Sequence, residues 1–387
     1  MPIKLQNSIN PLQDGRSTAR LLLAAALSIP GISAIPNLMA PTAARSESSE
    51  NEFRFSFFNY REWQAGNDQR MHVNAPMVYV KSMVDSSTQV DGSFVLDSVS
   101  GASPLYHDTL SGASGKGIED QRTAANINVT ETFDSFSLRL GGSLSNEDDY
   151  DSNGASIEGR FWGPSRNTIL NIGLSAARDK ITSSNDPTLD EDKSTTGLGL
   201  GVTQILDENS IGQSNITFSA SHGYQSDSYK SFDLRPESRE GMAWLTRYIR
   251  YFASADGSLH ADYRYFQDNW GVRAHTLETR WYQPLGSSPW TLIPRIRYYS
   301  QCKADFYSND FPPTEDSQSY TADQRLSGFG SILFGLKLER EIQKDMGASL
   351  SFDYMQQRGL FKIDGPGSPG LDPFSAGILS LGFFVKF

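Results

Sequence analysis

Apolar and polar residues alternate with a period of two along most of this chain, and this alternation constrains its fold more than any other feature. The clearest example is the C-terminal run of alternate apolar residues Leu379, Leu381, Phe383, Val385 and Phe387. A period of two places successive side chains on opposite faces of a β-strand, whereas an amphipathic helix repeats after about 3.6 residues. Because no helical stripe persists along the chain, the sequence predicts an all-β fold.

The predicted strands are longer than those of most soluble sheets. They run about 10 to 14 residues, whereas globular strands typically have about 5 to 6 and a tilted strand crosses a bilayer with about 9 to 11. One face of each strand is apolar, and the other is rich in Gly, Ser, Asn and Asp. An apolar surface around a wet lumen is typical of membrane barrels, so we predict a closed antiparallel transmembrane β-barrel of about 16 strands, with 14 to 18 as the range.

Turn residues divide the alternating sequence into these strands. The predicted ranges are 52–61, 70–84, 87–99, 120–133, 135–145, 151–163, 166–179, 194–206, 212–226, 240–254, 257–268, 270–284, 289–302, 325–341, 345–357 and 374–387. Short and long connections alternate between them, as expected for short periplasmic turns and longer extracellular loops. If Phe387 ends on the periplasmic side, every long connection lies outside, and only the tight connection at Asn269 breaks the pattern.

Aromatic residues recur near the predicted strand ends, where membrane barrels carry interfacial girdles. The candidates are Phe57, Phe58, Tyr60, Trp63, Phe161, Trp162, Tyr263, Tyr265, Phe266, Trp270, Trp281, Tyr282, Trp290, Tyr298 and Tyr299. Ordinary core packing is the alternative for each single aromatic residue. We predict the girdles from the recurrence of these residues along the chain.

Composition excludes several other classes of protein. The single Cys among 387 residues cannot form an internal disulfide or a cysteine-based metal site. A net charge of −11 argues against a nucleic-acid partner, because nucleic-acid-binding surfaces are usually basic. Beyond the N-terminus, no run reaches the roughly 18 consecutive apolar residues of a membrane-spanning helix.

The N-terminus has the three-part order of a secretory signal peptide. Arg16 and Arg20 precede the short apolar stretch 21–29, and small residues follow it. A cut after Ala44 divides the chain into a signal peptide, 1–44, and a single outer-membrane β-barrel domain, 45–387. We therefore predict export and location in the bacterial outer membrane of a Gram-negative cell.

Two sets of residues resemble known families. The terminal pattern that ends in Phe383, Val385 and Phe387 resembles the C-terminal signature of bacterial outer-membrane barrels, which implies that the barrel-assembly machinery reads it. The segments Asp97–Pro104 and Leu234–Glu240 are similar to those of the domain-of-unknown-function family 3570. This second resemblance covers nearly the whole mature chain and implies an outer-membrane barrel, but it implies no activity.

The sequence offers little support for a catalytic or metal-binding site. The five His residues are scattered, and no metal-ligand or nucleophile-elbow spacing is present, so we predict no enzyme activity, no metal and no cofactor. An outer-membrane lipid hydrolase, with His222 or His260 as its base, is the less favoured alternative. Acidic clusters on predicted external loops offer a weak possibility of Ca²⁺ binding or divalent bridging to lipopolysaccharide: Glu147, Asp148, Asp149, Asp151; Asp186, Asp190, Glu191, Asp192; Asp310, Glu315 and Asp316.

Arginines concentrate on the neighbouring predicted strands between 240 and 302. The candidates for the lumen or its constriction are Arg247, Arg250, Arg264, Arg273, Arg280, Arg295 and Arg297, with Asp97, Arg235 and Arg239 at the rim. Arg247 and Arg250 differ in phase, as do Arg273 and Arg280, so without a bulge not all point inward. Such arginines either screen anions in a channel or brace the interior by pairing with carboxylates.

The long segment Ser100–Glu119 is predicted to fold into the lumen as a constriction or plug, with Asp97 near Arg235 or Arg239. The favoured function is porin-like or gated passage of small solutes of unknown identity. A non-transport surface barrel with interaction loops is the alternative. Outer-membrane lipid and lipopolysaccharide, the assembly machinery and the solute are the expected partners.

Overall fold

The described part of the chain folds as sixteen long strands with two short 3-10 helices. The computed structural model describes residues 51–64, 69–101, 118–183, 186–227, 233–309 and 319–387. The elements are β1 Glu52–Gln64, β2 Gln69–Met83, β3 Thr88–Gly101, β4 Ile118–Thr132, β5 Phe136–Asn146, β6 Tyr150–Trp162, β7 Thr168–Ile181, β8 Glu191–Asp207, β9 Ser210–Gly223, β10 Ser238–Phe252, β11 Gly257–Asp268, β12 Arg273–Pro284, β13 Trp290–Gln301, η2 Gln324–Leu326, β14 Phe329–Gln343, β15 Met346–Arg358, η3 Gly359–Phe361 and β16 Phe374–Lys386. Within these ranges, no helix is long and apolar enough to cross a membrane.

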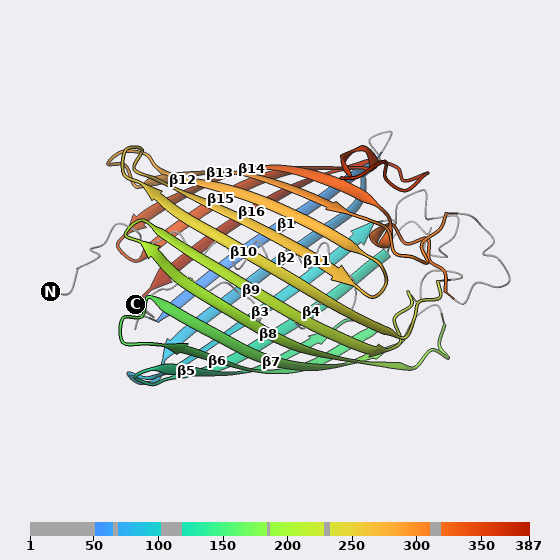
Figure 1. The fold of residues 1–387 in the computed structure, drawn as a ribbon, viewed down its shortest axis with the longest axis horizontal. Helices are drawn as coiled ribbons and strands as arrows, with labels where there is room; N and C mark the ends of the chain where they lie inside the picture. Colours follow the sequence, from blue (N-terminus) through green and yellow to red (C-terminus); the bar gives the residue numbers. More distant parts are fainter. Residues whose placement is uncertain (1–50, 65–68, 102–117, 184–185, 228–232, 310–318) are drawn as a thin grey trace.

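The strands form a closed barrel. Each strand pairs antiparallel with its neighbours in sequence, and β1 pairs with β16 in the register Phe53 opposite Val385 (Figure 1). Closure leaves no unpaired strand edge, which satisfies the backbone of every strand. The predicted antiparallel barrel and its count of 16 strands are therefore confirmed. The predicted signal peptide, 1–44, lies outside the described residues.

Alternation along each strand separates the outer face from the lumen. On β9 and its neighbours, for example, Phe218 points outward with 42% of its surface exposed, whereas the adjacent Thr217 points inward and is buried. Cross-strand register keeps like faces together, because Phe218 lies opposite Leu198 of β8 and Met242 of β10. The barrel thus carries a continuous apolar outer surface, as the alternation predicts.

The two ends of the barrel differ in the length of their connections. Short turns join the strands at the end where the chain terminates, and longer connections lie at the opposite end, with the tight 269–272 connection among them (Figure 1). Local chemistry shapes the short turns. In the first of them, Asp85 Oδ1 accepts hydrogen bonds of 2.8 Å from the backbone N–H groups of both Ser87 and Thr88. These bonds lower the pKa of Asp85 to about 2.

Two strands begin three or more residues later than predicted, and side-chain capping explains both differences. The predicted strand 270–284 starts at Arg273, because Asp268 Oδ1 accepts from the N–H groups of Trp270 and Val272 and closes a turn there. The predicted strand 325–341 starts at Phe329, since the preceding residues form η2. Asp323 caps η2 by accepting from the Arg325 N–H.

The lumen has an apolar sector that the alternation does not predict. Phe58 and Tyr60 were expected in the girdle, but they occupy inward positions of β1 and are 1% and 2% exposed. They form one buried cluster with inward residues of β2, β14, β15 and β16, including Leu333 and Ile378. The girdle prediction is wrong for Phe58 and Tyr60, because both faces of β1 carry aromatic residues and only the odd positions point outward. It is also wrong for Trp270 and Tyr282, which are each 3% exposed, and for Phe266 and Tyr299, which occupy inward positions of β11 and β13.

Candidate functional site

A band of paired charges lines the lumen on β10 to β15. Its first pair joins Arg247 of β10 to Asp262 of β11, which lie opposite each other and point inward. Arg247 donates from Nε to Asp262 Oδ1 at 2.6 Å and from Nη2 to Oδ2 at 3.0 Å. Both oxygens of this carboxylate are therefore engaged by one guanidinium in a bidentate pair.

Strands β12, β13 and β15 extend this charged band. Glu278 of β12 pairs with Arg280 and, at 3.3 Å, with Arg295 of β13. Arg295 also reaches Asp353 of β15 at 3.4 Å, across the intervening strand β14. Gly335 of β14 makes this reach possible, because a Cβ atom at this position would collide with the Asp353 carboxylate. A glycine at the crossing point thus gives two strands direct electrostatic contact.

The structure divides the predicted lumenal arginines into two groups. Arg247, Arg264, Arg280, Arg295 and Arg297 all occupy inward positions.

Arg250 and Arg273, by contrast, lie on the outer face and are exposed, so their placement in the lumen is corrected. Neither β10 nor β12 contains a register shift in its pairs, and an odd offset along a regular strand reverses the face. Arg250 is three residues from Arg247, and Arg273 is seven from Arg280. Their positions follow directly from strand periodicity.

The opposite wall of the lumen, on β3 to β9, combines amide and hydroxyl groups with ion pairs of its own, among them Lys193 with Asp179 and Arg160 with Glu158. Asn128 Nδ2 donates to Asp91 Oδ2 at 3.0 Å, and Arg139 Nη2 reaches the same oxygen at 2.8 Å. Asn126 and Asn215 also occupy inward positions in this wall. The lumen therefore carries paired charges on both sides, and the side formed by β3 to β9 adds amides and hydroxyl groups.

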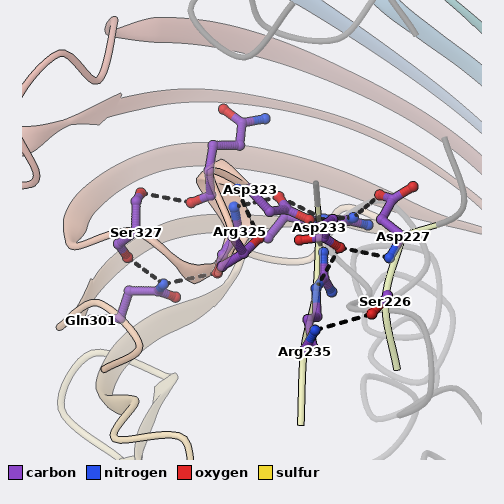
Figure 2. Close-up of polar contacts among 10 residues, drawn as sticks. Ser226, Asp227, Asp233, Arg235, Gln301, Asp323, Arg325 and Ser327 are labelled. Atoms are coloured by element: carbon purple, nitrogen blue, oxygen red, sulfur yellow. Dashed lines mark hydrogen bonds and ion pairs between the residues drawn. The ribbon is translucent and has the colours of Figure 1, made fainter. Parts of the chain in front are cut away.

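A compact polar network at the long-loop end joins two connections that are distant in sequence. Arg235, in the β9–β10 connection, donates from Nη2 to Asp323 Oδ2 at 2.8 Å and pairs with Asp233 at 2.8 Å (Figure 2). Arg325 also binds Asp323, and its Nη2 donates to Asp227 at 2.7 Å. Burial alone would lower the pKa of the Arg325 guanidinium, but the carboxylates of Asp323 and Asp227 outweigh burial and raise this pKa.

This network belongs to a packed layer that we call the mouth cap, defined as residues 233–237 and 302–328 where described. Gln301, at the inward-facing end of β13, anchors the cap by donating to the carbonyl oxygens of Arg325 at 3.0 Å and Ser327 at 2.7 Å (Figure 2). An isolated bridge pairs Leu234 with Tyr320. The cap therefore folds against the lumenal side of the rim and does not extend away from it.

The cap has its own apolar core beside β11 and β12. Leu326 is fully buried there against Trp270 and Tyr307. Arg239, at the start of β10, lies 4.4 Å from the Trp270 ring centre, and its Nε and Nη2 both donate to Asp268 Oδ2. Sequence reasoning singled out Arg235 and Arg239 but missed this cap. Its contacts join segments with no local pattern in common.

Three other sequence predictions have distinct outcomes. The predicted plug lies largely in 102–117, outside the described residues. The backbone of Asp97 pairs with Arg122 of β4, and its side chain is likewise not described. His260 points into the lumen and is buried, whereas His222 is exposed on the outer face, so these two residues lie on opposite faces.

The acidic loops are partly neutralised by their own neighbours. Lys180 pairs with Asp190 and lies 3.8 Å from Asp192, and Arg122 lies 3.8 Å from Glu147. Among the residues that the structure describes, no three potential metal ligands converge, and the acidic residues of 310–316 fall outside that part. The weak possibility of Ca²⁺ binding stays a prediction.

Comparison with known proteins agrees with this architecture. A family model described as "Protein of unknown function (DUF3570)" matches residues 19–190 and 182–368. A bacterial polysaccharide outer membrane secretin is similar with a TM-score of 0.51 at 9% identity, over 88% of this chain and 99% of that chain. CdiB from Acinetobacter baumannii is similar with a TM-score of 0.50 at 10% identity, over 85% of this chain and 60% of that chain. Among curated proteins, no sequence is significantly similar. The structural likeness shows an outer-membrane barrel fold.

Proposed function

The chain belongs to the DUF3570 family, and we propose that it lies in the outer membrane and passes small water-soluble solutes through its lumen. One observation carries this proposal: a closed sixteen-strand barrel combines an apolar outer surface with a lumen lined by charged, amide and hydroxyl groups. Barrels of about 16 strands are wide enough to hold an aqueous channel. The short-turn end would face the periplasm, and lipopolysaccharide would surround the opposite half.

The mouth cap and the apolar sector support gated or size-limited passage over a wide open pore. The cap is anchored on the lumenal side by Gln301, so it lies where solutes would enter. Phe58 of β1 and Ile378 of β16 add bulk to the lumenal side of their strands. Both features narrow the route, and we expect a small conductance with an upper limit on solute size.

Reconstitution into planar bilayers tests this function. Folded protein should produce discrete current steps, and liposomes that contain it should admit a monosaccharide faster than a trisaccharide. A matched variant, Gln301→Ala, removes the anchor of the cap and should raise the conductance or the size limit. Folded wild-type protein that inserts but neither conducts nor admits any sugar would overturn the proposal.

A non-transport surface barrel is the second candidate, and the buried core of the mouth cap favours it. Leu326 and Asp323 are fully buried within connections that an open channel would not need to order. A rigid loop layer of this kind is suited to presenting a fixed surface to a partner. Absence of conductance, together with unchanged protection of the cap in intact membranes, would favour this alternative.

A further inference from the structure

One lumenal guanidinium lacks a carboxylate partner. Arg264 of β11 occupies an inward position and is half-buried, between Asp262 and Phe266 on the same face of its strand. Its guanidinium lies 5.4 Å from the Phe266 ring centre. Among the described residues, no carboxylate is within ion-pair distance of it. Partial burial of a charge without an opposite partner is unfavourable, so an anion bound beside Arg264 would be stabilising.

Two carboxylates on the same strand are paired with other arginines. Asp262 accepts two hydrogen bonds from Arg247. Asp268, at the end of the same strand, accepts from Arg239 on Oδ2 and from two backbone N–H groups on Oδ1. Both acids are therefore already paired with another guanidinium.

The surroundings of Arg264 add further positive potential and polar groups. Thr276 lies opposite Arg264, and Tyr299 of β13 lies opposite Thr276, so the three form one inward row. Tyr299 interacts electrostatically with Arg264, Arg297 and Arg239. These arginines add positive charge to the wall that leads to the mouth cap.

From this geometry we infer that Arg264 and Thr276 form a lumenal subsite for an oxyanion, the carboxylate or phosphate group of a small solute. The hydroxyl group of Tyr299 beside them already donates to Gln301 Oε1. Guanidinium groups bind such groups through charge-assisted and bidentate hydrogen bonds. The Phe266 ring beside Arg264 offers an apolar surface for the rest of the solute. This inference rests on the proposed passage of solutes, and it names their chemical class as anionic.

Equilibrium binding tests the subsite without requiring conductance. The folded full-length protein in detergent at low ionic strength is titrated calorimetrically with benzoate, inorganic phosphate and neutral benzamide. Wild-type protein should bind at least one of the two anions and bind benzamide far more weakly. Arg264→Gln should weaken anion binding about tenfold or more, since a hydrogen bond to a charged group is lost. Arg264→Lys should retain part of the affinity.

Arg250→Gln is the matched control, because it removes an arginine from the exposed outer face of the adjacent strand. This variant should bind anions as the wild type does. The inference is overturned if wild-type protein binds neither anion, if Arg264→Gln binds them unchanged, or if Arg250→Gln weakens binding equally. Circular dichroism verifies the fold of each variant. Conductance is measured separately, so a barrel that conducts without binding anions refutes the subsite alone, and one that binds anions without conducting refutes only the proposed passage.

Discussion

Arg235 and Asp323, which are 88 residues apart in sequence, form an ion pair of 2.8 Å at the mouth of the barrel. Their side chains are 3% and 0% exposed. A charge that is buried to this extent depends on its partner, because removing one member leaves the other desolvated and unpaired. The pair therefore links the order of the β9–β10 connection to that of the β13–β14 connection.

Asp323→Ala should release the mouth cap while the barrel stays intact. Loss of one partner of a buried ion pair typically destabilises the folded structure by about 3–5 kcal/mol. Here we expect the loss of stability to be confined to the cap. Hydrogen exchange should accelerate strongly in 302–309 and 319–328 and remain unchanged in β4 to β8. Asp190→Ala, which removes an exposed acid that pairs with Lys180, should leave exchange in the cap unchanged. Equal exchange in both variants would contradict the structural role of the pair.

Gly335→Ala should destabilise the barrel, because the added methyl group would displace the Asp353 carboxylate and weaken its contact with Arg295. Inserting atoms into such a packed site typically costs about 1–3 kcal/mol. The control is Gly142→Ala, where a Cβ atom would meet only Ile127 at 4.0 Å. Guanidinium unfolding of the refolded proteins should separate the two variants, and equal midpoints would contradict the crossing of β14 by this ion pair.

Phe218→Arg should destabilise the barrel in a lipid bilayer by about 2–4 kcal/mol, because it places a charge on the lipid-facing surface. The adjacent Ser219 points into the lumen, so Ser219→Arg should be tolerated with a much smaller loss. The measurement is reversible unfolding in phospholipid vesicles. A larger loss for Ser219→Arg than for Phe218→Arg would mean that the two faces have been exchanged.

The Asp85 turn should lose stability only in strong acid. Hydrogen bonds from Ser87 and Thr88 hold the pKa of Asp85 at about 2, below its ordinary value of 3.8. Because the folded pKa is depressed, the contribution is fully present above the ordinary value and is lost as pH falls through 3.8 toward 2. A carboxyl NMR titration of the folded protein should give this low pKa. A value near 3.8 would show that the turn does not form as described.

Strand positions are predictable from this sequence because, within each strand, apolar residues that face outward alternate with polar residues that face the lumen. In β7, Leu170, Ile172 and Leu174 alternate with Asn171 and Gly173, and the structure places the three apolar residues outside. Because this alternation lies within a single strand, it can be recognised without knowing which strands are its neighbours. It is weaker in β1, where aromatic residues occupy both phases, and there Phe58 and Tyr60 were assigned to the wrong surface.

For the candidate site, the sequence predicts which face each arginine occupies but not which carboxylate it pairs with. Parity along a regular strand separates Arg247 from Arg250, and it requires no tertiary information. The partner of Arg247 depends instead on the register between β10 and β11, which brings Asp262 directly opposite it. The mouth cap carries no such local signal, because its ion pairs join connections whose residues are distant in sequence.

By itself, the sequence determined that the chain forms long amphipathic strands, where those strands lie and which side chains share a face, because a period of two is imposed by strand geometry. Only the tertiary structure decided that Asp262 and Asp268 are taken by Arg247 and Arg239, which leaves Arg264 without a carboxylate. Such choices depend on cross-strand register and loop packing. These bring charges within a few ångströms of one another regardless of their separation along the chain.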